Sequence, residues 1–299
     1  MDNYKKSNKF SIPVINGKLV RDNSFNKVSV LSPSFQYGLT VFEGIRAYIN
    51  NQGDLVPFLL DEHIKRLIDS SKLLGIKLNF SITDIKDDIK LILKAKKQTQ
   101  DIYIKYIICF LGEGSWYSSH NPDRVCFSYL SPTTLRSKEP EYLTASFTSI
   151  NRISSNIISP RIKCGANYIN SRMGVLDVND ISCYSKIPIF IDNNGFVSET
   201  SGACIFIIKD NKIITPSISS SVLESITRAY ILKSLAQKLN QFIFKEELID
   251  RWDILNADAV FIVGTNVEIK GIKAIDHIEY KTNNDVFLSI FEKFKDIIK

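Results

Sequence analysis

Three residues of this chain have side chains that could hold an aldehyde cofactor and move a proton: Lys163, Tyr168 and Glu199. The small residues 164–166 (Cys, Gly, Ala) follow the lysine and would let a flat ring lie close to the backbone, although a tight turn explains them equally well. An amine such as that of Lys163 forms a Schiff base with pyridoxal phosphate and, once displaced by substrate, acts as a general base. A carboxylate such as that of Glu199 keeps the ring nitrogen protonated, so that the ring becomes an electron sink.

Three further segments could bind the phosphate of such a cofactor. Residues 225–227 (Ser-Ile-Thr) open a predicted helix, where amide donors and the helix dipole favour an anion, and Thr227 adds a hydroxyl. The turn 264–266 (Gly-Thr-Asn) follows a predicted strand and offers exposed amides. Arg66 lies opposite the apolar stripe of its predicted helix and could supply a permanent charge. The plain alternatives are a serine N-cap, a simple turn and a solvent-facing arginine.

Length and composition indicate a globular protein of about two domains. The chain has 299 residues, of which 44% are apolar. Its net charge of +6 comes from 38 basic and 32 acidic residues that do not form a basic stripe interleaved with aromatic residues. This distribution argues against a nucleic-acid-binding face and suits small anionic molecules better.

Cysteine and histidine usage predicts a cytoplasmic protein without a metal site. The five cysteines form no Cys-x-x-Cys pair, and the chain opens with a polar, charged segment. The three histidines lie far apart in the sequence, without the spacing of metal ligands. Cys164 is expected to be a small buried hydrophobe rather than a nucleophile. No apolar run approaches the ~18 residues that span a bilayer.

The hydrophobic pattern predicts two α/β domains. We expect a small N-terminal domain over residues 1–130, a linker over 131–140 that is rich in proline, threonine and charges, and a larger C-terminal domain over 141–299 that carries Lys163. In the first domain we expect a hairpin-rich sheet covered by two helices, with strands at 10–19, 42–49, 102–111 and 125–130 and helices at 62–74 and 82–93. In the second we expect strands at 142–150, 187–191, 196–199, 203–208, 212–215 and 259–263, and helices at 168–178, 225–239 and from 285.

Six segments, taken in order, resemble the branched-chain amino-acid aminotransferase family, whose members are pyridoxal-phosphate enzymes of fold type IV. The similarity extends from about residue 10 to the last residue, and ordered segments are a stronger signal than any single motif. The segments are Gln36–Arg46, Glu62–Leu67, Lys163–Tyr168, Ser198–Glu199, Ile226–Arg228 and Gly264–Thr265.

The resemblance implies a two-domain fold-type IV architecture with the active site at the domain interface, in a homodimer or higher homo-oligomer. It also implies transfer of an amino group from an L-branched-chain or other apolar amino acid to a 2-oxo acid, as in branched-chain amino-acid biosynthesis. Lys163 would be the Schiff-base lysine, Tyr168 the donor to the phenolic oxygen and Glu199 the partner of the ring nitrogen. The other cofactor contacts would be Arg66, Leu223, Ser225, Ile226, Thr227 and Thr265. The substrate pocket would be lined by Tyr37, Phe42, Tyr103, Lys105, Thr265 and Asn266.

Three positions depart from the family pattern. Lys105 stands where an arginine usually binds the distal carboxylate of glutamate, and lysine lacks the bidentate fork of a guanidinium. Ser225 replaces a glycine before Ile-Thr, and residues 201–204 (Ser-Gly-Ala-Cys) differ from the usual Gly-Glu-Asn. These changes leave the catalytic groups in place but alter the substrate and cofactor contacts.

Other activities stay open. A 4-amino-4-deoxychorismate lyase would use the same lysine to eliminate pyruvate, and a D-amino-acid aminotransferase would act on the opposite enantiomer. The run 41–46 (Val-Phe-Glu-Gly-Ile-Arg) favours the branched-chain enzymes over both. A homologue that binds cofactor without turnover is a third alternative, but such a binder has no need for both Lys163 and Glu199.

Overall fold

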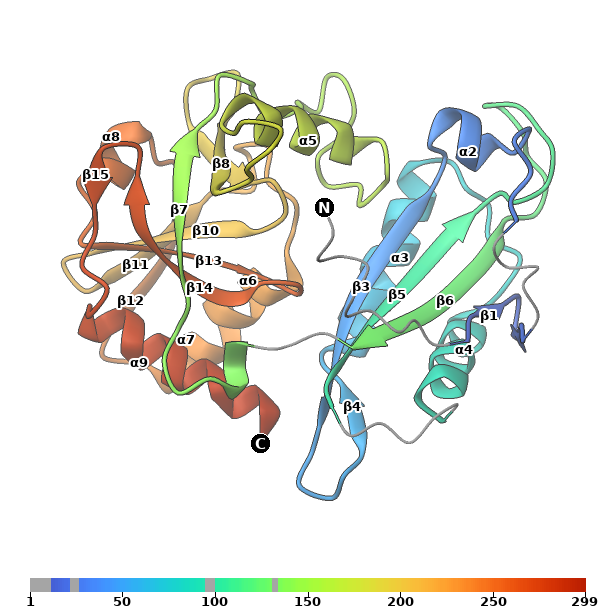
Figure 1. The fold of residues 1–299 in the computed structure, drawn as a ribbon, viewed down its shortest axis with the longest axis horizontal. Helices are drawn as coiled ribbons and strands as arrows, with labels where there is room; N and C mark the ends of the chain where they lie inside the picture. Colours follow the sequence, from blue (N-terminus) through green and yellow to red (C-terminus); the bar gives the residue numbers. More distant parts are fainter. Residues whose placement is uncertain (1–11, 22–26, 95–99, 131–133) are drawn as a thin grey trace. The chain divides into compact units, whose positions relative to one another are not determined.

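The computed structural model describes residues 12–21, 27–94, 100–130 and 134–299. It divides into two compact units, each built around one sheet (Figure 1). The described residues up to 130, together with 162–166, form the first unit, and residues 134–161 and 167–299 form the second. The mixed α/β architecture predicted from the sequence is confirmed.

The first unit contains a six-stranded antiparallel sheet with the strand order β2-β1-β6-β5-β3-β4. Helix α3 packs on β3, and α4 packs on β6 and β1. The elements are β1 (Val14–Ile15), β2 (Lys18–Leu19), α2 (Pro33–Tyr37), β3 (Val41–Ile49), β4 (Leu55–Pro57), α3 (Leu60–Leu73), α4 (Ile82–Lys94), β5 (Ile102–Cys109) and β6 (Asp123–Leu130).

Alternation along β5 decides which of its side chains enter the core. Ile104 and Tyr106 belong to the apolar cluster that α3 and α4 cover, together with apolar residues that recur every three or four positions on both helices. Because successive side chains of a strand point to opposite faces, Tyr103 and Lys105 project from the other face of the sheet. The pattern of this one strand therefore places two of the predicted substrate-pocket residues on a common face.

The second unit contains a nine-stranded sheet with the order β12-β11-β10-β13-β14-β7-β8-β9, and β15 pairs with β14. Its strands are β7 (Tyr142–Phe147), β8 (Lys186–Ile191), β9 (Val197–Thr200), β10 (Cys204–Lys209), β11 (Lys212–Pro216), β12 (Ile243–Glu247), β13 (Ala259–Gly264), β14 (Glu268–Ile275) and β15 (Ile278–Glu279). Most pairs are antiparallel, but β7 pairs in parallel with both β14 and β8, and β11 pairs in parallel with β12.

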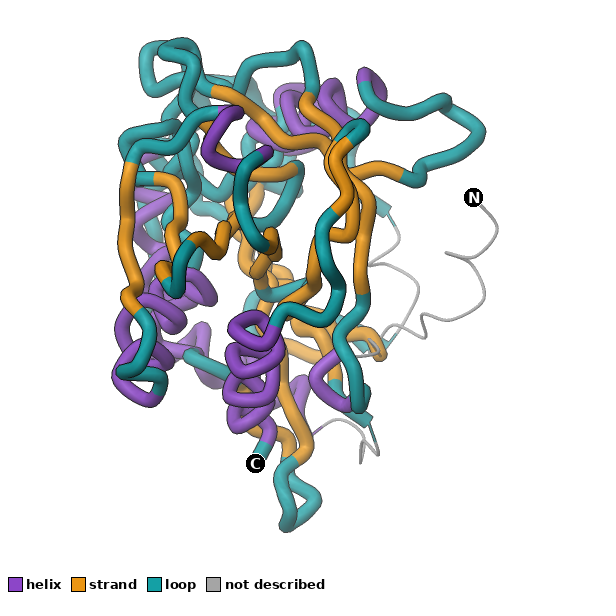
Figure 2. The backbone as a smooth tube through the Cα atoms, turned by 90° about the vertical axis from the view of Figure 1, so that its left-hand side faces the viewer, coloured by secondary structure: helices purple, strands orange, loops and turns teal. Residues whose placement is uncertain are grey.

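The helices of the second unit cover an aromatic and aliphatic core. Phe261 stacks on Phe206 and contacts Phe287 of the C-terminal helix, with centroid separations of 5.1 and 5.3 Å. This helix, α9, packs on β14 and is the last α-helix before the C-terminus in the tube view (Figure 2). The helical segments are η2 (Thr134–Arg136), α5 (Asn167–Asp177), α6 (Ile226–Tyr230), the π-helix η3 (Ile231–Leu235), α7 (Ala236–Lys238), α8 (Arg251–Leu255), α9 (Asp285–Phe294) and η4 (Lys295–Ile298). No helix in the described ranges is both long and apolar enough to cross a membrane.

The segment that carries Lys163 belongs to the first unit, whereas the sequence predicts it in the C-terminal domain. Cys164 forms an antiparallel bridge with Val41 and is fully buried in the first core, which confirms its predicted role as a small hydrophobe. A Cβ atom on Gly165 would lie 2.7 Å from Oγ1 of Thr40, so a larger residue would require the Thr40 side chain to shift. The small residues after the lysine thus serve the packing of this segment against the start of β3.

The described part of the predicted linker also packs into a unit. Residues 131–133 lie outside the described residues, and 134–136 form η2. Leu135 is fully buried, and its amide donates to Oε2 of Glu268 at 3.3 Å. This part of the segment is therefore integrated into the second unit.

Candidate active site

The backbone of Lys163 is held on two sides within the first unit. Its amide donates to the Oγ of Ser70 on α3 at 3.1 Å, and its carbonyl accepts from the amide of Phe42 on β3 at 3.1 Å. The Nζ atom lies 5.1 Å from the centroid of the Phe42 ring. These contacts fix the point from which the amine extends.

A second lysine shares the same aromatic ring. The Nζ of Lys105 lies 3.4 Å from the centroid of Phe42. Burial, followed by the charge of Lys163, lowers the pKa of Lys105 to about 8 against the opposing attraction of Glu43. The structure thus brings together Lys163, Phe42 and Lys105, three of the residues predicted from the sequence.

Tyr103 lies on the same face of the sheet and explains the glycine of the Phe-Glu-Gly run. A Cβ atom on Gly44 would lie 1.6 Å from the Tyr103 hydroxyl, so the phenol ring can cross β3 only at a glycine. The ring stacks on Tyr129 at 5.1 Å, and the guanidinium of Arg46 lies 5.8 Å from its centroid. The Tyr103 ring is therefore held in one position. Its neighbour Tyr129 is not predicted from the sequence as a site residue.

Arg66 is mostly buried, which corrects its predicted place opposite the apolar stripe of α3. Its Nε and Nη2 donate to Oε1 and Oε2 of Glu43 at 2.7 and 2.8 Å. The Nδ1 of His63 lies 2.7 Å from Oε2 of Glu43, and because an ionised carboxylate only accepts, this nitrogen donates. Bidentate pairing fixes the plane of the guanidinium, so Arg66 is pre-oriented.

The charges of this cluster are coupled. Burial raises the pKa of Glu43, but Arg66 and His63 outweigh it and hold that pKa well below its usual value. Burial also lowers the pKa of His63 against the attraction of Glu43. Neither Glu43 nor His63 is predicted from the sequence as a functional residue, although both lie inside segments that resemble the family.

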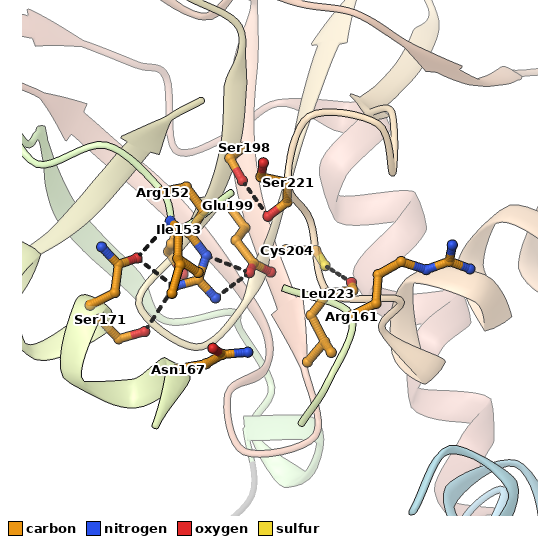
Figure 3. A network of polar contacts seen from close by, with 12 residues as sticks. Arg152, Ile153, Arg161, Asn167, Ser171, Ser198, Glu199, Cys204, Ser221 and Leu223 are labelled. Atoms are coloured by element: carbon orange, nitrogen blue, oxygen red, sulfur yellow. Dashed lines mark hydrogen bonds and ion pairs between the residues drawn. The ribbon is translucent and has the colours of Figure 1, made fainter. Parts of the chain in front are cut away.

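Glu199 lies on β9 of the second unit and is 4% exposed. Its Oε1 accepts from Nε and Nη2 of Arg152 at 3.0 and 2.7 Å (Figure 3). The ion pair compensates the burial of both charges, because an unpaired carboxylate in this position would be costly. Glu199 is thus a buried carboxylate rather than a surface strand end.

Arg152 links Glu199 to the helix that carries Tyr168. Its Nη1 donates to Oδ1 of Asn170 at 3.1 Å. It also donates to Oγ of Ser171 at 3.2 Å (Figure 3), and both partners lie on α5. Tyr168 is the second residue of that helix and is 38% exposed. Sequence reasoning missed Arg152, since no local motif indicates a partner far along the chain.

We expect Arg152→Met to destabilise the protein by about 3–5 kcal/mol, because it leaves the Glu199 carboxylate buried without its cation. Urea unfolding measures the difference. Arg161→Met is the matched control, since the ion pair of Arg161 with Glu224 is about half exposed, and it should change stability by less than ~0.5 kcal/mol. If both changes lower the free energy of unfolding equally, the buried pair of Arg152 with Glu199 stabilises the protein no more than an exposed ion pair does.

The loop before α6 contacts side chains of β9 and β10. The Ser198 hydroxyl donates to the carbonyl of Ser221 at 3.0 Å, and the Cys204 sulfur lies 3.9 Å from the carbonyl oxygen of Leu223 (Figure 3). Cys204 belongs to the 201–204 segment that departs from the family pattern. That segment thus contributes a contact which places Leu223.

Ser225 needs no glycine-like backbone. Its φ of −75° is open to any residue, and its hydroxyl accepts from the amide of Arg228 at 3.3 Å as the N-cap of α6. Arg228 in turn donates to the carbonyl of Pro216 and pairs with Glu246, which anchors α6 on β11 and β12. Thr227 is 3% exposed beside this anchor. The serine therefore replaces glycine without strain.

The remaining predicted residues lie in turns or at an element end. Thr265 and Asn266 form the turn between β13 and β14, and the turn begins beside the 201–204 segment, since a Cβ on Gly264 would lie 3.4 Å from the Gly202 carbonyl. Tyr37 is the last residue of α2 and is 50% exposed. The predicted residues thus fall into two sets, one in each unit, and the chain passes from Lys163 to Tyr168 through the peptide bond between residues 166 and 167.

Comparison with known proteins gives the chain a family context. Residues 40–275 match the model of the family described as amino-transferase class IV. The chain is similar to the branched-chain-amino-acid aminotransferase of Escherichia coli strain K12, with 31% identity over 269 residues that cover 88% of this chain and 84% of that protein.

Two solved structures are similar along nearly the whole chain. The branched-chain amino acid aminotransferase of Thermobaculum terrenum, solved in its PLP form, has a TM-score of 0.86 and 28% identity, covering 98% of this chain and 94% of that one. The branched-chain aminotransferase of Thermoproteus uzoniensis, solved with norvaline, has a TM-score of 0.85 and 29% identity, covering 96% and 94%. Both similarities extend over the two units described above.

Proposed function

The chain belongs to the class IV aminotransferase family, of fold type IV, and from this premise we propose that it moves the amino group of a branched-chain or other apolar L-amino acid to a 2-oxo acid. The proposal depends mainly on two groups, an amine whose backbone is held by hydrogen bonds and a carboxylate that is buried in an ion pair. Lys163 is held at its amide and carbonyl, and Glu199 is buried against Arg152. An aminotransferase needs both an amine and a charged carboxylate of this kind.

The donor set fits pyridoxal phosphate. Lys163 offers the amine for its aldehyde, and Glu199 offers a buried carboxylate for its ring nitrogen. Tyr168 would donate to the phenolic oxygen, and Leu223 would pack on the ring. When bound, the cofactor supplies an electron sink for the pair of electrons left on the substrate α-carbon. The phosphate would be held by Arg66, Ser225, Ile226, Thr227 and Thr265.

Within the reaction, Lys163 is the group that moves the proton. After substrate displaces it, the free amine would take the proton from the substrate α-carbon and deliver the same proton to the cofactor carbon that carried the aldehyde. Glu199 would keep the ring nitrogen of the cofactor protonated, and the hydrogen bonds from Arg152 hold Glu199 in place. Glu43 holds Arg66 in one orientation, so an anion meets a guanidinium that does not have to reorganise.

The substrate would be bound by residues of different character. Tyr37, Phe42 and Tyr103 are aromatic and suit an apolar side chain. Lys105 would attract the distal carboxylate of a dicarboxylic substrate, as a point charge rather than a fork. Thr265 and Asn266 would receive the α-carboxylate. The same-face position of Tyr103 and Lys105 on β5 supports a role for both in one pocket.

A panel of L- and D-amino acids tests the proposal. We expect L-leucine, L-isoleucine and L-valine to bleach the visible band of the protein loaded with pyridoxal phosphate, and a 2-oxo acid to restore it. D-Enantiomers should leave the band unchanged. Bleaching by D-amino acids alone, or release of pyruvate from aminodeoxychorismate without amino transfer, would overturn the proposal.

A further inference from the structure

Glu246 on β12 contacts both ends of the loop before α6, which comprises residues 217–225. Its Oε1 accepts from the amide of Ile218 at 3.1 Å and from the hydroxyl of Ser217 at 3.4 Å, at the start of the loop. Its Oε2 lies 2.7 Å from Nη2 of Arg228, which follows the end of the loop. One side chain on a neighbouring strand therefore ties the start of the loop to the first turn of α6.

The guanidinium of Arg228 is directed toward β11 and β12. Its Nε donates to Oγ1 of Thr215 at 3.3 Å, and its Nη2 donates to the carbonyl of Pro216 at 2.8 Å. The side chain of Arg228 is buried, so its charge requires a partner, and Glu246 provides one. Burial raises the pKa of Glu246, but the hydrogen bonds from Arg228 and Ile218 outweigh it and lower that pKa below its ordinary value. Glu246 is therefore ionised at neutral pH, and the pair is charged.

The middle of the loop contains two unfavourable features. Ser221 has a φ of +59°, in the left-handed region that residues other than glycine rarely adopt. The hydroxyl of Ser220 is buried without a hydrogen-bond partner among the described residues. Such features persist only where the surrounding structure imposes them. The hydrogen bond from Ser198 to the carbonyl of Ser221 (Figure 3) and the contacts of Glu246 at the two ends of the loop contribute to this constraint.

We propose that Glu246 is a positioning residue for the phosphate of the cofactor, because it fixes α6 and the loop before it. The inference rests on the proposed function, which places the phosphate at residues 225–227. Helix α6 continues into η3 and α7, so the helical segment extends from residue 226 to 238. The amides of Ile226 and Thr227 come first in this segment, where an amide has no acceptor within the helix. Donors that are held in place before an anion binds do not have to reorganise.

The positioning effect of Glu246 and its charge act on phosphate binding with opposite signs. If Glu246 acted only as a nearby negative charge, its removal would strengthen the binding of a phosphate. Because it holds the amides of α6 in place, its removal instead weakens that binding and leaves the imine with Lys163 unaffected. Pyridoxal phosphate and pyridoxal differ only in the phosphate group, so the ratio of their dissociation constants isolates this effect.

The test is dilution of the full-length protein after loading with pyridoxal phosphate or with pyridoxal, with the visible band as the measure of binding. We expect Glu246→Ala to raise the dissociation constant of pyridoxal phosphate about tenfold, the scale of one charge-assisted hydrogen bond, and that of pyridoxal less than ~2-fold. Glu246→Gln keeps the size of the side chain in case the alanine variant misfolds, and it should shift the ratio in the same direction. Glu247→Gln on the same strand is the matched control, since its contact with Lys245 is partly exposed, and it should change neither constant.

The outcomes separate the inference from the proposed function. Equal weakening of both compounds, or an unchanged ratio, would show that Glu246 serves stability alone. Tighter binding of pyridoxal phosphate would show that Glu246 acts through its charge. Each of these results overturns the inference and leaves the aminotransferase proposal standing, whereas absence of a visible band in the parent protein with either compound overturns both.

Discussion

Replacing Lys163 with alanine is expected to yield a folded protein that lacks the visible cofactor band and transfers amino groups at least ~10⁴-fold more slowly than the parent. The rate falls because the side chain provides both the covalent attachment and the proton transfer, and proton transfer alone accounts for about 10²- to 10⁴-fold. Absorbance of the purified protein and steady-state transfer from L-leucine to a 2-oxo acid measure the two effects.

The fold should survive this change, because the hydrogen bonds described for Lys163 belong to its backbone. The amide bond to Ser70 and the carbonyl bond from Phe42 do not depend on the side chain. Lys163→Arg is the matched control: it keeps a positive charge but cannot form an imine, so it should behave like the alanine variant. An alanine variant that keeps the band and the parent rate would refute the assignment of this lysine.

Much of the fold could be predicted because most elements carry their own hydrophobic period. Helices α3 and α4 and strands β3 and β5 have apolar residues at the spacing that their geometry demands. Strands β12 and β14 were missed for different reasons. β12 is an edge strand with mostly exposed side chains. β14 begins at Glu268, a buried charged residue whose φ is +58°. Neither has the apolar run that identifies a strand.

The place of Lys163 could not be predicted from local patterns. Its segment joins the first unit through the pairing of Cys164 with Val41, two residues that lie far apart in the sequence. A composition shift can locate a boundary in the chain, but it cannot indicate that a short segment after the boundary returns to the first sheet. The predicted division at 131–140 places the lysine in the C-terminal domain, whereas the compact units group residues 162–166 with the first sheet.

For the site, the residue types that perform chemistry could be identified, but not the residues that hold them. Lys163 and Glu199 could be singled out among many lysines and glutamates because they lie in segments that resemble the aminotransferase family. Arg152 lies 47 positions before Glu199, and no period or motif links two such residues. The Arg66 pair with Glu43 has the same character, since it joins a helix to a strand 23 positions earlier. Ion pairs of this kind become visible only when the chain is folded.

Changing Glu199 to glutamine is expected to reduce turnover by about 10³-fold while the cofactor stays attached to Lys163. A neutral amide cannot hold the proton on the ring nitrogen as a carboxylate does, and loss of one well-placed electrostatic contact costs about 10²- to 10³-fold in catalysis. The same change leaves Arg152 buried beside a neutral group, so unfolding free energy should fall by about 3 kcal/mol. Single-turnover bleaching with L-leucine and urea unfolding measure the two losses.

A double-mutant cycle and a matched control separate these two effects. Glu199→Gln and Arg152→Met should be non-additive in stability by at least ~1 kcal/mol, because each change already removes the same ion pair. Glu247→Gln on β12 is the control, since its contact with Lys245 is partly exposed, and it should change stability by less than ~0.5 kcal/mol and leave turnover unchanged. Turnover of the Glu199→Gln variant within tenfold of the parent would exclude Glu199 as the partner of the ring nitrogen, because the buried ion pair would then serve stability alone.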